Sequence, residues 1–99
     1  MKRITDEQLA AEHHKEMEIF GSILKALRTL KAMSQKDLSQ NTGLSRETIS
    51  KIEHGSMNPS LTTILALARG LGVDPINLLR DIEKQEELPY YIKMFAQEL

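Results

Sequence analysis

The apolar residues of this chain recur at the spacing of amphipathic helices. Between residues 18 and 32, positions at i, i+3, i+4 and i+7 predict one buried helical face, formed by Phe20, Ile23, Leu24, Leu27 and Leu30. Upstream, Thr5 and Gln8 have the spacing of a capping box, which predicts a helix that starts at Asp6. This first segment is expected either to continue into the second or to break near Gly21.

Serine and glycine residues divide the middle of the chain into two short helices. Ser34 and Ser45 are predicted to cap their N-termini, because a serine hydroxyl can accept a hydrogen bond from the first helical turn. Gly43 and Gly55 are predicted to end them, because glycine adopts the left-handed backbone conformation at little cost.

Two more helices are predicted after an Asn-Pro loop. Ser60 is the expected N-cap of the first, whose inward face is predicted to hold Leu61, Ile64, Leu65, Ala68 and Leu71. Asp74 followed by Pro75 predicts the start of the next, since proline suits the first helical position. Five helices joined by short turns, with no strand pattern, predict a compact all-α fold.

The composition narrows the class of protein. A chain of 99 residues with 40% apolar and only 4% aromatic residues indicates one small helical domain. Without cysteine there is no thiolate metal site, and the polar run over residues 12–16 is interpreted as solvated surface, so no metal or cofactor is expected. No run resembles a signal peptide or reaches the roughly 18–20 apolar residues that span a membrane, so a cytoplasmic location is expected.

The two short helices around Gly43 carry the functional prediction. A tight turn between two helices, the second polar on its outer side, is typical of a helix-turn-helix unit, whose second helix enters the major groove of DNA. The inward side of that helix is expected to hold Leu44, Thr48, Ile49 and Ile52. On its outer side, Arg46 can bind guanine, Glu47 can accept from a cytosine amino group, and Lys51 can reach a base or a phosphate. Phosphate or positioning contacts are expected from Ser34, Ser45, Thr48, Ser50 and Asn58.

Residues 18–83 resemble the Xre-like family of phage-repressor (Cro/CI-type) helix-turn-helix domains. The resemblance rests on the stretches LKALR, MSQKDLSQNTGLSRETISKIEHG, NPSLTTILALARGLGV and INLL, and it covers 66 of the 99 residues. It implies a five-helix, lambda-repressor-like DNA-binding domain that acts as a dimer on a palindromic operator. Residues 1–17 would then form an N-terminal helical extension, and residues 84–99 an amphipathic C-terminal tail.

The resemblance also implies roles for individual residues. Gln35 would bind a phosphate and brace the recognition helix, and Arg28 and Glu53 would form an inward ion pair. The base-reading positions of the family correspond to Arg46, Glu47 and Lys51. The chain departs from the family at residues 54–58, which read HGSMN, where basic residues that contact phosphate are common.

The charge balance predicts how affinity for DNA would arise. The whole chain carries a formal charge of −1, and residues 18–83 hold eight Lys or Arg against seven Asp or Glu. Because net charge governs non-specific binding through counterion release, few phosphate contacts and a modest salt dependence are expected. A dimer would then be needed for affinity.

The C-terminal tail, residues 84–99, carries a second candidate contact surface. If it is helical, one stripe is formed by Leu88, Tyr91, Ile92, Phe95 and Leu99. Three arrangements fit this stripe: it folds back on the fifth helix of its own chain, it joins two copies of the chain, or it binds another protein such as a toxin.

Two functions of different class follow. The favoured one is a sequence-specific DNA-binding transcriptional regulator, a repressor that acts as a homodimer on double-stranded DNA. The alternative is an antitoxin that binds a partner protein and autoregulates its operon. No nucleophile–base pair and no phosphate-binding loop is evident in the sequence, so catalysis is not expected.

Overall fold

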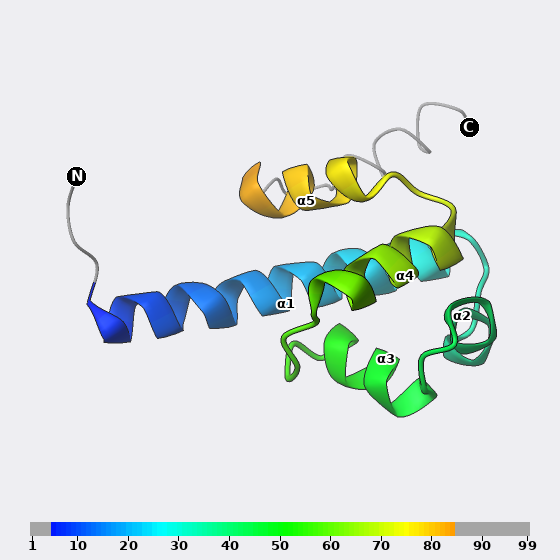
Figure 1. The fold of residues 1–99 in the computed structure, drawn as a ribbon, viewed down its shortest axis with the longest axis horizontal. Coiled ribbons are helices and arrows are strands. Elements are labelled where there is room, and N and C mark those ends of the chain that lie inside the picture. The colour runs from blue at the N-terminus through cyan, green and yellow to red at the C-terminus, as the bar shows by residue number, and fades with distance from the viewer. Residues whose placement is uncertain (1–4, 85–99) are drawn as a thin grey trace.

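The computed structural model describes residues 5–84, which fold into five α-helices (Figure 1). The helices are α1 (Asp6–Leu30), α2 (Gln35–Thr42), α3 (Arg46–Glu53), α4 (Leu61–Leu71) and α5 (Pro75–Lys84). The predicted all-α architecture is confirmed, with α3 ending one residue earlier than the sequence suggested.

The long helix α1 is continuous over 25 residues, so the predicted break near Gly21 does not occur. Its start is fixed by the expected capping box: the Thr5 N–H donates to Gln8 Oε1 at 2.8 Å, and the Gln8 N–H donates to Thr5 Oγ1 at 3.1 Å. The first half of α1 projects beyond the other helices (Figure 1). The boundary expected between residues 17 and 18 therefore falls inside one helix.

The N-caps predicted for the other four helices are all present. The hydroxyl oxygens of Ser34, Ser45 and Ser60 each accept a hydrogen bond from the backbone N–H three residues further on. The carboxylate of Asp74 accepts one from the Ile76 N–H at 2.9 Å. Each cap satisfies a backbone donor that has no partner inside its helix, which fixes where that helix begins.

All five helices contribute side chains to the core, with α3 and α5 on opposite sides of α1 and α2 beside the start of α3 (Figure 1). Its fully or almost fully buried side chains are Phe20, Ile23, Leu24, Leu27, Leu38, Ile49, Ile52, Leu67, Leu71 and Leu78. Two residues predicted to face inward are exposed, Leu30 at 42% and Leu61 at 66%. Leu30 is the last residue of α1 and Leu61 the first of α4, whereas the buried side chains of α4 come from its later turns.

The backbone of α1 approaches α3 closely at Gly21. A Cβ atom at this position would overlap the carbonyl oxygen of Ile52 and lie 2.7 Å from that of Glu53. Only glycine allows this approach, so α1 sets the position of the C-terminal end of α3. Within residues 5–84, none of the helices has the length and apolar character needed to cross a lipid bilayer.

Candidate nucleic-acid interface

The turn between α2 and α3 fixes the angle at which α3 leaves the domain. Gly43 ends α2 in the left-handed conformation, with φ of +79°. Thr42 Oγ1 accepts a hydrogen bond from the Leu44 N–H at 3.1 Å, and the Ser39 hydroxyl donates to the Leu44 carbonyl oxygen. The predicted role of Gly43 is confirmed. The contribution of Ser39 was not predicted from the sequence, because its partner is a backbone atom beyond the turn.

The inner side of α3 anchors it to the core. Ile49 and Ile52 are fully buried, as predicted, and Leu44 is half-buried against the same cluster. Thr48 is only half-buried, and its position beside the N-cap leaves its hydroxyl near the surface. Because the anchoring side chains lie on one side, the opposite side of α3 faces away from the domain.

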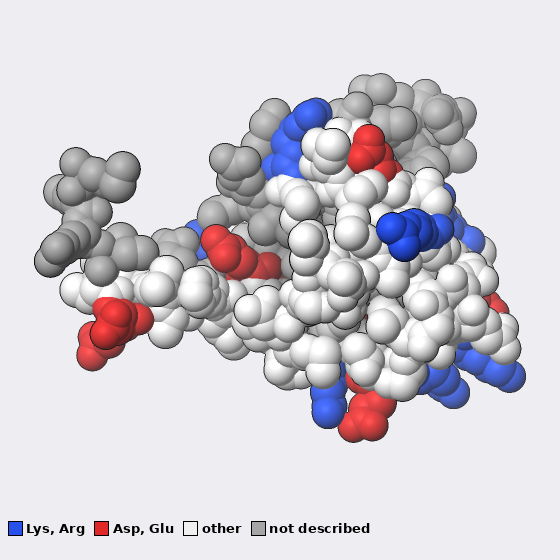
Figure 2. Space-filling model, viewed as in Figure 1, with Lys and Arg blue, Asp and Glu red and all other residues white. Residues whose placement is uncertain are grey.

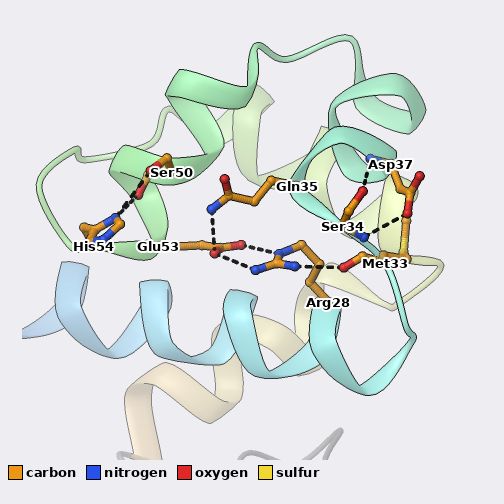
Figure 3. Close-up of polar contacts among 8 residues, drawn as sticks. All are labelled: Arg28, Met33, Ser34, Gln35, Asp37, Ser50, Glu53 and His54. Atoms are coloured by element: carbon orange, nitrogen blue, oxygen red, sulfur yellow. Dashed lines mark hydrogen bonds and ion pairs between the residues drawn. The ribbon is translucent and has the colours of Figure 1, made fainter.

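A polar cluster ties α3 to the two helices that precede it (Figure 3). Arg28 of α1 donates to both carboxylate oxygens of Glu53, from Nε at 2.7 Å and from Nη2 at 3.0 Å, and its Nη1 donates to the Met33 carbonyl at 2.8 Å. Gln35 of α2 donates from Nε2 to Glu53 Oε1 at 3.1 Å. The expected ion pair and the bracing role of Gln35 are therefore present, while a phosphate contact by Gln35 stays a prediction.

This cluster is largely shielded from water. The side chains of Arg28 and Glu53 are 13% and 3% exposed. The hydrogen bond to Glu53 raises the pKa of Arg28 above its ordinary value, against the opposing effect of burial. Two parallel N–H donors of the Arg28 guanidinium fix the geometry of the pair.

The outer side of α3 carries the side chains predicted to read bases. Arg46, Glu47 and Lys51 are all exposed. Lys51 Nζ lies 3.1 Å from Glu47 Oε1, one helical turn away, with exposed fractions of 51% and 78%. Figure 2 shows basic and acidic side chains side by side along the edge of the molecule formed by α2 and α3. The outer face is thus mixed in charge rather than uniformly positive.

Two pairs of polar residues flank this face. The Ser45 hydroxyl accepts from the Thr48 N–H at 3.0 Å and donates to Thr48 Oγ1 at 2.8 Å, so Ser45 is engaged as a cap. At the other end, His54 Nδ1 lies 2.7 Å from the Ser50 carbonyl oxygen (Figure 3). A carbonyl oxygen only accepts, so this contact is a hydrogen bond in the tautomer that carries the proton on Nδ1.

The remaining predicted positions lie elsewhere. Ser34 caps α2, and its N–H donates to the Asp37 carboxylate at 2.8 Å. This hydrogen bond lowers the pKa of Asp37, with a further contribution from the Ser34 hydroxyl. Asn58 is exposed and lines an open cavity of about 290 Å³ with residues of α1, including His13 and Phe20, and its phosphate contact stays a prediction. The tail stripe lies outside the described residues; it comprises Leu88, Tyr91, Ile92, Phe95 and Leu99.

The arrangement of α2, the glycine turn and α3 agrees with a known family. The Helix-turn-helix family model matches residues 24–78, more than half of the chain. The chain belongs to the Xre-like helix-turn-helix family of DNA-binding regulators. The resemblance stated from the sequence is therefore confirmed.

Several relatives are restriction-modification controllers. Control protein C.MunI of Mycoplasma sp is 39% identical over 67 residues, an alignment that covers 67% of this chain and 90% of that protein. The crystal structure of C.AhdI from Aeromonas hydrophila is similar with 40% identity and a TM-score of 0.61, over 63% of this chain and 94% of that one. C.Esp1396I, solved as a tetramer with its natural 35-base-pair operator, has 27% identity and a TM-score of 0.65, over 71% of this chain and 92% of that one.

Other relatives are longer than this chain. The chain is 32% identical over 75 residues to the immunity repressor of Bacillus phage phi105 and spans 52% of it. It spans only 20–26% of several archaeal regulatory proteins. These similarities favour a transcriptional regulator over the antitoxin alternative.

Proposed function

We propose that this protein is a sequence-specific DNA-binding repressor that acts as a homodimer on a palindromic operator. The observation that carries the proposal is the outer face of α3, where Arg46, Glu47 and Lys51 are exposed on a helix whose other face is buried. A major groove about 12 Å wide admits one such helix. The hydrogen bonds of Glu53 to α1 and α2 hold the helix at a fixed angle, which a reader of base edges requires.

A dimer is proposed because one subunit offers little positive charge. Basic and acidic side chains alternate on the outer face, so counterion release from a single domain would be small. Two copies of α3 in successive major grooves, about 34 Å apart, would add their contacts on one molecule of DNA. C.Esp1396I, a structural relative, forms a tetramer on its operator, which supports an assembly of several subunits.

Repression is supported by the similarity to a phage immunity repressor. A dimer bound across a promoter would exclude polymerase without any enzymatic step, and we propose no catalytic activity for this chain. A regulator of this kind must act where the DNA is, which agrees with the cytoplasmic location expected from the sequence.

Selection of bound sequences from a random DNA pool, with the oligomeric state measured by size-exclusion chromatography and light scattering, tests the proposal. A two-fold symmetric motif and a dimer are expected. Enrichment of no motif would contradict sequence-specific binding. A reporter driven by a promoter that contains the motif should be silenced, whereas activation would contradict repression.

Removal of residues 84–99 tests the role of the tail. If the tail joins two subunits, the shortened chain elutes as a monomer and loses affinity for the full operator but retains the fold of residues 5–83. If the tail packs on its own subunit, the dimer persists and the melting temperature falls. Co-purification of a small protein with the full chain alone would instead support a partner such as a toxin.

A further inference from the structure

The ion pair on the outer face of α3 joins two of the residues proposed to read DNA. Lys51 Nζ and Glu47 Oε1 are 3.1 Å apart, and both side chains are more than half exposed. The two residues are separated by four positions, so their side chains lie one above the other on one side of the helix. An acceptor and a donor are therefore presented together on the outer face of α3.

We propose that Glu47 and Lys51 read a single C·G base pair as one unit, with cytosine on the Glu47 side. This inference rests on the proposed function. In the major groove, the cytosine N4 amino group lies beside guanine O6, and the two are joined by a hydrogen bond of about 2.9–3.0 Å. The amino group keeps one free hydrogen in the groove, and O6 keeps one free lone pair. The Glu47 carboxylate then accepts from the amino group, and the Lys51 ammonium donates to O6. Together with the ion pair and the base-pair hydrogen bond, these contacts close a ring of four atoms: Glu47 Oε1, cytosine N4, guanine O6 and Lys51 Nζ.

The other three base pairs fit less well. In G·C and T·A, a carbonyl oxygen would face the Glu47 carboxylate and an amino group would face the Lys51 ammonium. In A·T, the amino and carbonyl groups have the favourable order, but adenine N7 repels the second carboxylate oxygen. The thymine methyl group also replaces guanine N7, which the ammonium can reach in C·G. Only C·G satisfies both side chains without an unfavourable neighbour.

The Glu47–Lys51 pair contributes to sequence specificity rather than to non-specific electrostatic affinity for DNA. Its two charges cancel, so it adds little to counterion release, in contrast to Arg46. This division of roles fits a domain with nearly balanced charge: dimerisation supplies affinity, and the ion pair supplies discrimination.

Alanine variants at the two positions test the unit on the operator found by selection. In the wild type, replacing the C·G pair of each half-site should weaken binding roughly 5- to 150-fold per contact. Glu47→Ala and Lys51→Ala should each lose this discrimination, and the double variant should lose no more than either. Preference at the base pair assigned to Arg46 should persist. If Glu47→Ala and Lys51→Ala lose discrimination at two different base pairs, the two residues do not read as a unit and the proposal is wrong.

A conservative variant sharpens the test. Glu47→Gln should change the preferred pair from C·G to A·T at that position, because glutamine pairs with adenine N6 and N7. Replacing the guanine of this one C·G pair by 7-deazaguanine should weaken binding by the wild type and leave binding by Lys51→Ala unaffected. Glu7→Ala, which removes one negative charge at the far end of α1, is the matched control.

If Glu47→Ala only raises affinity for all DNA, as a charge change alone would, Glu47 is not a reader and the inference is wrong. A wild type that enriches no sequence at all would instead contradict the proposed function itself. Melting curves of each variant show that the fold is intact.

Discussion

Glu53, the last residue of α3, is held by Arg28 of α1 through two hydrogen bonds of 2.7 and 3.0 Å. The carboxylate is almost completely buried, and its second partner, Gln35, comes from the first position of α2. One side chain therefore joins three helices at the base of the helix-turn-helix unit. This contact and the apolar packing of Ile49 and Ile52 together set the orientation of the outer face of α3.

Glu53→Ala is expected to lower the free energy of unfolding by about 3–5 kcal/mol, because the Arg28 guanidinium is left buried without its partner. Urea denaturation measures the loss. Replacing both partners by apolar residues, Arg28→Met with Glu53→Leu, should restore most of it. Lys51→Ala, which breaks an exposed pair on the same helix, should cost less than about 0.5 kcal/mol. Equal losses in the two single variants would contradict a special role for the buried pair.

Gly21→Ala is expected to destabilise the domain by about 1–3 kcal/mol, because the added methyl group overlaps the backbone at the end of α3. The helices must separate, so operator binding should weaken further than the lost stability explains. Thermal unfolding and a binding titration measure the two effects. Ser22→Ala changes the exposed neighbour on the same helix and should leave both nearly unchanged.

Ala32→Gly is expected to stabilise the domain, against the usual effect of glycine. Ala32 has a φ of +55°, which costs a residue with a Cβ atom about 1–2 kcal/mol. The greater freedom of glycine in the unfolded chain offsets part of this, so a net gain of about 0.5–1 kcal/mol is expected. Ala26→Gly, inside α1, should instead cost about 1 kcal/mol. A loss of stability in both variants would show that Ala32 is not strained.

Periodicity and capping rules predicted much of this fold because they depend on local sequence. The burial of Ile49 and Ile52 and the cap at Ser34 follow from spacing alone. The exposure of Leu61 could not be predicted this way, because it depends on which turns of α4 meet other helices. The close approach at Gly21 likewise depends on where α3 crosses α1, which no local pattern encodes.

The placement of the candidate site residues was predicted to a similar extent, and their contacts with DNA stay predictions. The positions of Arg46, Glu47 and Lys51 on the outer side of α3 follow from helical geometry. The i,i+4 spacing of Glu47 and Lys51 was visible in the sequence and could have indicated their ion pair. The bond from Gln35 to Glu53 spans 18 residues and required the fold.

Asp37 should contribute to the dependence of stability on pH. Its pKa is lowered in the folded state by the Ser34 N–H, so its stabilising effect is fully present above the ordinary value of 3.8. That effect is lost as the pH falls through the lowered folded value. Asp37→Asn does not titrate, so the difference in unfolding free energy between it and the wild type should shrink between about pH 5 and pH 2. Urea denaturation over this range measures it, and a constant difference would contradict the role of the cap.

Arg46→Ala should weaken binding to the selected operator by about 1–3 kcal/mol, because its bidentate contact with a guanine is lost. The same variant should accept any base pair at one position of each half-site and keep its preferences elsewhere. Competition titrations with single-base-pair variants of the operator measure both effects. Arg69→Ala removes an exposed positive charge on α4 and serves as the control for a change in charge alone. If Arg46→Ala binds every sequence more weakly by the same factor, Arg46 contacts phosphate and is not a base reader.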